Sequence, residues 1–205
     1  MEIKRDSYLQ QLISYRFDGL VKVITGIRRC GKSYLLKKIY RDYLLQNGVK
    51  EGQIITVELD LAKDIKYRNP LTLSSYVREK VEGSKEEYYL FVDEIQMSDE
   101  VKNPFNADGR KITFYDALND LRSLSNLDVY VTGSNSKMLS YDILTQFRDR
   151  GGEIRVYPLP FAEFYNEYKG DKRGRIIILM VVCRLLLHFN LREKLFEPYG
   201  KRKMG

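Results

Sequence analysis

Short apolar runs alternate along this chain with longer segments in which apolar residues recur every three or four positions. The runs are rich in β-branched and aromatic residues and end at glycine or polar residues, a pattern typical of buried strands. The third run is apolar without alternation, as expected when both faces of a parallel sheet are covered. The predicted strands are residues 20–25, 54–60, 88–94, 127–134 and 153–159.

Helical periodicity follows the first, second and third runs. Residues 73–83 predict one helix, and residues 113–124 predict another whose cap is Thr113 with Asp116. A polar stretch with Pro104 and Gly109 predicts a loop. From Gly31 to the stop signal Asn47-Gly48, apolar residues form two adjacent stripes, Leu35, Ile39, Tyr43 and Leu36, Tyr40, Leu44. Strands alternating with helices predict a three-layer α/β fold with a mostly parallel five-stranded sheet.

Composition places the chain among soluble globular proteins, since 43% of its 205 residues are hydrophobic and 31% are charged. Cys30 and Cys183 are too few for a disulfide framework, and no secretory signal is visible, so a cytoplasmic location is expected. His188 is the only histidine, which excludes a site built from histidine and cysteine ligands.

The positive net charge of +7 is confined to the C-terminal end of the chain. Residues 1–168 hold 25 basic and 25 acidic residues, whereas residues 169–205 hold 10 basic and 3 acidic ones. The main body therefore offers no electrostatic support for nucleic-acid binding, and only a folded, native tail would offer any.

Gly26–Ser33, with the sequence GIRRCGKS, fits the phosphate-loop pattern G-x-x-x-x-G-K-[ST] between a predicted strand and a predicted helix. Its glycines let backbone N–H groups face the phosphates, Lys32 reaches the β- and γ-phosphates, and the Ser33 hydroxyl binds Mg²⁺. The alternative interpretation of this motif is a glycine-rich turn that contains a lysine by chance. For Arg28 and Arg29 the alternative interpretation is exposed charge on a loop. The expected nucleotide contacts are Gly26, Ile27, Arg28, Arg29, Cys30, Gly31, Lys32, Ser33 and Tyr34.

Asp93 and Glu94 follow the third predicted strand, at the carboxyl edge where parallel sheets bind ligands. Asp93 is expected to hold the Mg²⁺ shell, and Glu94 to orient and polarise the attacking water. Two ordinary acids at a strand end are the alternative.

Further polar residues come after the fourth strand and before the fifth. Thr132, Ser134 and Asn135 are candidates for sensing the γ-phosphate, and the sequence does not choose among them, since a simple turn explains the same residues. Arg148 and Arg150 are candidates for stabilising transition-state charge, within the chain or across a subunit boundary, with solvated surface arginines as the alternative.

Four segments resemble a large prokaryotic family of AAA+-type ATPases: VITGIRRCGKSYLL, LFVDEIQ, VYVTGSNSKML and RVYPLPFAEFY. The resemblance covers residues 3–172. It implies ATP as the nucleotide, Lys32 and Ser33 as phosphate and Mg²⁺ contacts, Asp93 and Glu94 as the acidic pair, and Arg150 as the candidate arginine. Members of this family typically add a C-terminal nuclease-like domain, and they usually have glycine where this chain has Asp149.

The resemblance stops after residue 172, so residues 1–172 are expected to form the ATPase domain and residues 173–205 a tail outside it. The tail contains the apolar run at residues 174–189, which Arg184 interrupts and which is shorter than the roughly 20 residues of a membrane helix. One codon choice for residues 177–184 yields a family-like motif in another reading frame. We therefore interpret the tail as an out-of-frame translation that replaces the C-terminal domain, and gene sequencing tests this hypothesis.

The sequence thus predicts an ATP-binding protein with Mg²⁺-dependent hydrolysis, with a second copy or another protein as a candidate partner. A nucleotide-dependent switch with negligible turnover and a nucleic-acid-associated ATPase are the alternatives. No helical lid with its own arginine follows the fifth strand, which favours weak hydrolysis by this chain alone.

Overall fold

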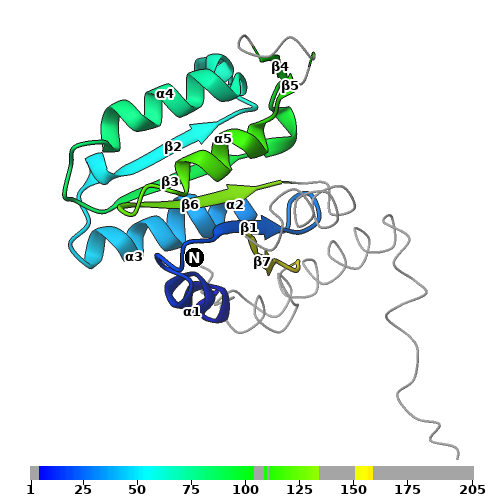
Figure 1. Cartoon of the computed structure of the whole chain (residues 1–205). Coiled ribbons are helices and arrows are strands. Elements are labelled where there is room, and N and C mark those ends of the chain that lie inside the picture. The colour runs from blue at the N-terminus through cyan, green and yellow to red at the C-terminus, as the bar shows by residue number, and fades with distance from the viewer. Residues whose placement is uncertain (1–4, 104–108, 110, 134–150, 159–205) are drawn as a thin grey trace, which may run out of the picture. The chain divides into compact units, whose positions relative to one another are not determined.

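The computed structural model describes residues 5–103, 109, 111–133 and 151–158, which belong to one compact unit, Lys4–Pro158. Its five-stranded sheet has the order β2-β3-β6-β1-β7, and every neighbouring pair is parallel (Figure 1). The predicted α/β class and parallel sheet are therefore confirmed. The strands are β1 (Val21–Thr25), β2 (Ile54–Glu58), β3 (Tyr88–Asp93), β6 (Leu127–Thr132) and β7 (Gly151–Arg155).

Helices cover both faces of this sheet and make the three layers that the alternating pattern predicts (Figure 1). α4 (Pro70–Val81) and α5 (Phe114–Leu121) lie on one face. On the other lie α1 (Asp6–Ser14) and a helical run made of α2 (Lys32–Tyr34), η1 (Leu35–Tyr40) and α3 (Arg41–Gln46). Successive strand residues serve opposite faces: Val23 belongs to the core under α4 and α5, and Ile24 to the core under the helical run.

The helical run begins and ends as predicted, but its middle segment η1 is π-helical. Only one of the two predicted stripes is fully buried. Leu36, Tyr40 and Leu44 each have 0% exposure, whereas Ile39 and Tyr43 are half-buried at the margin of the same core. A helix that packs on a sheet buries one stripe completely, and the neighbouring stripe covers the edge of the contact.

Other boundaries follow local capping chemistry. Asn69 accepts hydrogen bonds from the backbone N–H groups of Leu71 and Thr72, so α4 starts before its apolar stripe does. The predicted cap of α5 is confirmed, since Thr113 and Asp116 hydrogen bond reciprocally. β7 begins and ends before the run predicted for it, because its pairing with β1 starts opposite Val21.

Several short elements have no counterpart in the predicted pattern. They are α1, η2 (Glu51–Gln53), η3 (Ala62–Arg68), η4 (Ile95–Met97), and the antiparallel pair β4 (Val101–Lys102) and β5 (Lys111–Ile112). This pair flanks the predicted loop, whose Pro104 lies outside the described residues.

The expected boundary at residue 172 and the tail beyond it also lie outside the described residues. Within the part of the chain that the structure describes, no helix is long and apolar enough to cross a membrane.

Candidate functional site

The loop between β1 and α2 takes its shape from residues with left-handed backbone conformations. Gly26 has φ 148° and Gly31 has φ 96°, values that favour glycine, and Arg29 joins them at 66°. A Cβ on Gly26 would lie 2.3 Å from the backbone oxygen of Val156, so no larger residue fits there without moving the backbone. The two glycines of the predicted phosphate loop are therefore required by its geometry.

Lys32, the first residue of α2, is turned inward against this loop. Its side chain is buried, and its Nζ donates hydrogen bonds to the carbonyl oxygens of Gly26 at 3.0 Å and Ile27 at 3.1 Å. Cys30 is buried beside it. The rest of the predicted loop set faces outward: Ile27, Arg28, Arg29 and Tyr34 are all exposed.

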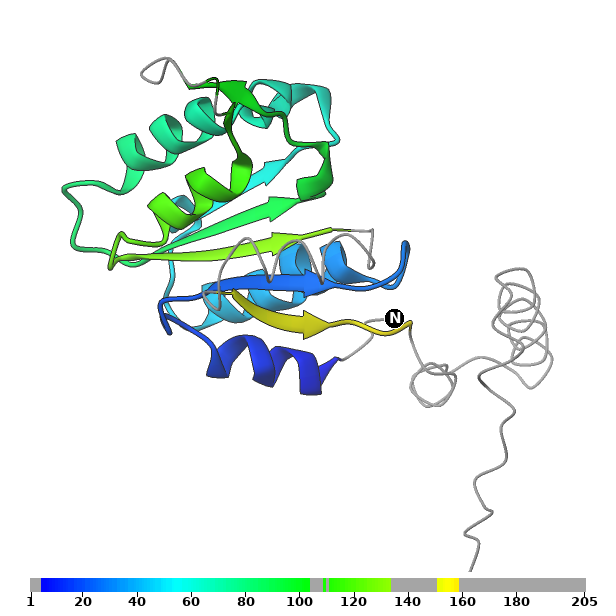
Figure 2. The ribbon, with the colours of Figure 1, turned by 45° about the vertical axis from the view of Figure 1, so that its right-hand side comes forward.

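Asp93, the last residue of β3, connects the loop to the carboxyl edge of the sheet, where the parallel strands end together (Figure 2). Its Oδ1 accepts a hydrogen bond from Ser33 Oγ at 3.0 Å and another from Thr132 Oγ1. Its Oδ2 forms an ion pair with Lys37 Nζ at 2.7 Å. Three separate elements therefore hold one nearly buried carboxylate in place.

Glu94 follows in a left-handed conformation with φ 56°, which is uncommon for a residue with a side chain. Its backbone N–H donates to Thr132 Oγ1 at 3.2 Å, and its half-buried side chain accepts a hydrogen bond from Gln96 Nε2. Thr132 is thus the γ-phosphate candidate that the structure places against both acids. Ser134, Asn135, Arg148 and Arg150 lie outside the described residues.

Lys37 joins Asp93 to a second carboxylate, Glu58 at the end of β2. Burial alone would lower the pKa of Lys37, but the hydrogen bonds to Asp93 and Glu58 outweigh it and raise that pKa above 10.5. Burial likewise would raise the pKa of Glu58, but hydrogen bonds from Lys37 and Lys63 hold it below 4.5. Lys37 and Glu58 are therefore both charged at neutral pH.

Arg5, which precedes α1, is a second cation beside the loop. It is only 7% exposed, and its guanidinium lies 3.9 Å from the position that a Cβ on Gly31 would take. It donates to the backbone oxygen of Tyr157 at 2.9 Å and stacks on the Tyr8 ring. Among the described residues, no carboxylate forms a salt bridge with it, although buried guanidinium groups are normally paired.

Sequence reasoning missed Arg5, Lys37 and Glu58. Glu58 carries a usable signal, because a charged residue at the end of a buried parallel strand lies at the ligand-binding edge. Lys37 is one of two consecutive lysines in a helical pattern, and nothing local distinguishes it from its exposed neighbour Lys38. For Arg5 the sequence holds no signal, since only the tertiary fold brings the start of the chain to the loop.

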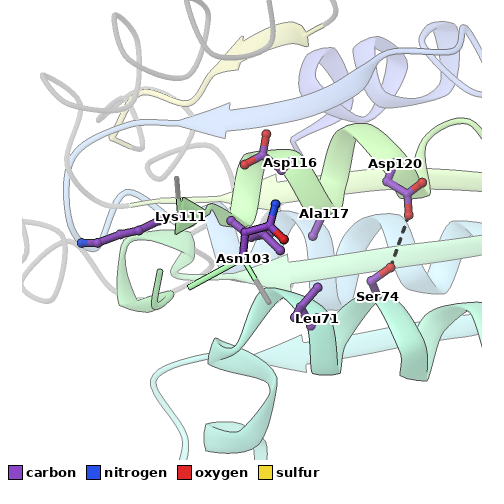
Figure 3. A pocket seen from close by; sticks show the side chains of 8 residues that line it. Leu71, Ser74, Asn103, Lys111, Asp116, Ala117 and Asp120 are labelled. Atoms are coloured by element: carbon purple, nitrogen blue, oxygen red, sulfur yellow. Dashed lines mark hydrogen bonds between the residues drawn. The ribbon is translucent and has the colours of Figure 1, made fainter. Parts of the chain in front are cut away.

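A cavity of about 380 Å³ opens elsewhere, between α4, α5 and the β4–β5 pair (Figure 3). Ser74 of α4 and Asp120 of α5 both line it and share a hydrogen bond of 3.4 Å. None of the predicted nucleotide-contacting residues lines this cavity. It is therefore separate from the phosphate loop and the acidic pair.

Comparison with known proteins identifies the kind of domain that carries this arrangement. A family model described as an AAA domain matches residues 18–165. An uncharacterized protein of Haemophilus influenzae is 35% identical over 175 residues, covering 85% of this chain and 40% of its own length. An uncharacterized protein of Methanocaldococcus jannaschii is 32% identical over 175 residues, and the match covers 82% of this chain and 34% of that protein. The chain thus spans less than half the length of these relatives.

Solved structures share the fold at low sequence identity. C. elegans PCH-2 superimposes with a TM-score of 0.56 at 14% identity, over 92% of this chain and 49% of that one. A DNA polymerase III gamma subunit-related protein from Thermotoga maritima gives 0.53 at 13% identity, over 84% and 54%. At these identities the likeness concerns the fold alone.

Proposed function

Because this chain belongs to the AAA domain family, we propose that it binds ATP together with Mg²⁺ and hydrolyses the nucleotide at the edge formed by β1, β3 and β6. Family membership supports a nucleotide-binding, ATPase-like module, and the finer assignment of residues is inferred from this chain's own geometry. The relatives are uncharacterized and longer than this chain, so they identify neither the process to which ATP hydrolysis would be coupled nor the partner.

The observation that carries the proposal is the meeting of Ser33, Asp93 and Thr132 beside Lys32. A hydroxyl and a carboxylate at hydrogen-bond distance are hard oxygen donors of the kind that Mg²⁺ takes. The loop next to them has its left-handed glycines and a buried ammonium, and these are the groups that receive phosphate oxygens. The residues present therefore fit both the nucleotide and the metal.

Each residue then has a distinct task. Lys32 exchanges its loop carbonyl partners for phosphate oxygens, and Ser33 and Asp93 hold the metal. Mg²⁺, when bound, would offset negative charge on the phosphate oxygens. Glu94 accepts a proton from the attacking water, and Thr132 keeps the backbone of Glu94 and the carboxylate of Asp93 in register. Asn135 and Arg150 remain predictions.

Arg5 adds a nucleotide contact to this set. Arg5 is buried beside Gly31 and has no salt bridge to a carboxylate among the residues that the structure describes, so a phosphate or another anion bound at the loop would suit its guanidinium. Replacing Arg5 by methionine should therefore weaken nucleotide binding at least about tenfold.

A switch with negligible turnover is the second candidate, and one observation favours it. The carboxylate of Glu94 already accepts a hydrogen bond from Gln96, and its backbone has an uncommon conformation, so an attacking water would share that carboxylate with the Gln96 amide. Nucleotide binding alone does not involve the Glu94 carboxylate in this way.

Phosphate release and ATP binding by the 205-residue chain test both candidates. If the chain hydrolyses ATP, Glu94→Gln should abolish phosphate release and retain binding, whereas Lys32→Ala should weaken binding itself. Glu79→Gln, on the exposed side of α4, is the matched control and should match the wild type. Binding with no measurable release in the wild type would favour the switch, and absence of ATP binding would refute the proposal.

A further inference from the structure

Glu58 and Asp93 form a pair of carboxylates at the ends of neighbouring strands. They are directly opposite in the parallel register of β2 and β3, so their side chains leave the same face of the sheet. Their side chains are only 20% and 6% exposed. Two negative charges this close repel each other strongly where solvent screening is weak, so the pair requires a cation.

Lys37 supplies that cation from the helical run that packs on this face. Its Nζ lies 2.7 Å from Asp93 Oδ2 and also donates a hydrogen bond to Glu58. The Lys37 side chain is 28% exposed, so its ammonium contacts both carboxylates and still reaches solvent. Lys63, which is 62% exposed, contacts the same Glu58 from the outside at 3.0 Å.

The other oxygen of Asp93 is already used as well, because Ser33 and Thr132 donate their hydroxyls to it. Two carboxylates with two hydroxyls beside them are a donor set that a divalent cation would accept. A metal ion arriving alone has to displace an ammonium that the fold holds in place. A metal ion that arrives with a nucleotide brings phosphate oxygens as ligands. It then needs only the donors next to Ser33 and does not have to displace the ammonium.

We propose that Lys37 is a built-in counter-ion that keeps free Mg²⁺ away from the Glu58 and Asp93 pair, so that a divalent cation binds this edge only together with nucleotide. Lys37 is then a positioning residue, since it acts through Asp93 and not on the reacting atoms. The inference rests on the proposed function, in which Asp93 serves the metal.

Manganese binding to the nucleotide-free 205-residue chain tests this role, with electron paramagnetic resonance as the readout. Lys37→Met and Lys37→Gln should each bind Mn²⁺ at least about tenfold more tightly than the wild type, because the two carboxylates lose their tethered cation. Lys37→Gln retains a hydrogen-bond donor, which guards against loss of folding. Lys37→Arg keeps the positive charge and should behave as the wild type does.

Two further variants separate the counter-ion role from general charge removal. Lys63→Gln removes an exposed cation that forms ion pairs with Glu58 and Asp64, so the Lys37 contact that joins Glu58 to Asp93 stays intact and the Mn²⁺ affinity should remain near that of the wild type. Adding Glu58→Gln to Lys37→Gln should return the affinity to the wild-type range, since one carboxylate of the pair is then neutral.

Unchanged Mn²⁺ affinity in both neutral Lys37 variants, with native circular dichroism, would overturn the proposal. So would tight Mn²⁺ binding by the nucleotide-free wild type. ATP binding by the wild type is measured separately in Mg²⁺ buffer. Its absence would overturn the proposed function and the nucleotide half of this inference, whereas the Mn²⁺ series decides the counter-ion half by itself.

Discussion

Thr132 has a single hydroxyl that serves two groups at the edge of the sheet. This hydroxyl donates a hydrogen bond to Asp93 and accepts one from the backbone N–H of Glu94. Thr132 itself is fully buried. Thr132→Val keeps the shape but leaves the Glu94 N–H without this acceptor and removes one of the donors to Asp93, which should cost about 1–3 kcal/mol in the free energy of unfolding. Urea unfolding measures this loss. Thr72→Val, on the exposed face of α4, is the control and should change stability by less than about 0.5 kcal/mol.

Glu58 makes a pH-dependent contribution to stability. Because its folded-state pKa lies below the ordinary 4.5, the contribution is present above that pH and is lost as the pH falls through the lowered pKa. The stability difference between the wild type and Glu58→Gln should therefore be largest at neutral pH and shrink in acid. Urea unfolding across this range checks it, with Glu79→Gln as the control. A difference that stays constant with pH would contradict the assignment.

At the scale of elements, the loop between β1 and α2 depends on its approach to the residue after β7. A Cβ on Gly26 would meet the Val156 oxygen at 2.3 Å, and the Gly26 φ of 148° is unfavourable for alanine. Gly26→Ala should therefore displace the loop and weaken ATP binding by at least about tenfold. Calorimetric titration measures the affinity. Gly52→Ala is the control, since a Cβ there meets nothing within 4 Å, and equal affinities in both variants would refute the requirement.

At the scale of the whole molecule, a buried ion pair ties the N-terminal segment to the sheet at the end away from the candidate site. Lys22 of β1 is 0% exposed and pairs with Asp128 of β6, which is 2% exposed. Asp128 also accepts hydrogen bonds from the Tyr130 hydroxyl and the Phe17 backbone. The pair therefore joins β1, β6 and the segment that follows α1.

Lys22→Met should destabilise the fold by about 3–5 kcal/mol, because it leaves the Asp128 carboxylate buried without its cation. Denaturant unfolding provides the measurement. Lys38→Met is the matched control: its salt bridge with Asp42 lies on a helix surface with the lysine 52% exposed, and its loss should cost about 0–0.5 kcal/mol. A small effect of Lys22→Met would show that Asp128 is satisfied by its other partners.

The sequence by itself determined the parallel sheet, the helical layers and the phosphate loop. Each of these depends on local order: strand runs bounded by polar residues, stripes at helical spacing, and glycines at fixed distances from Lys32. Asp93 was predictable for the same reason, since it ends a buried apolar run.

Only the tertiary structure decided which distant residues meet at that edge. The register of β2 against β3 sets Glu58 beside Asp93, and the packing of the helical run brings Lys37 between them. The pairing of β6 with β3 brings Thr132 into contact with both acids, and the path of the N-terminal segment places Arg5 at the loop. These contacts arise from burial and strand order, which no local sequence pattern encodes.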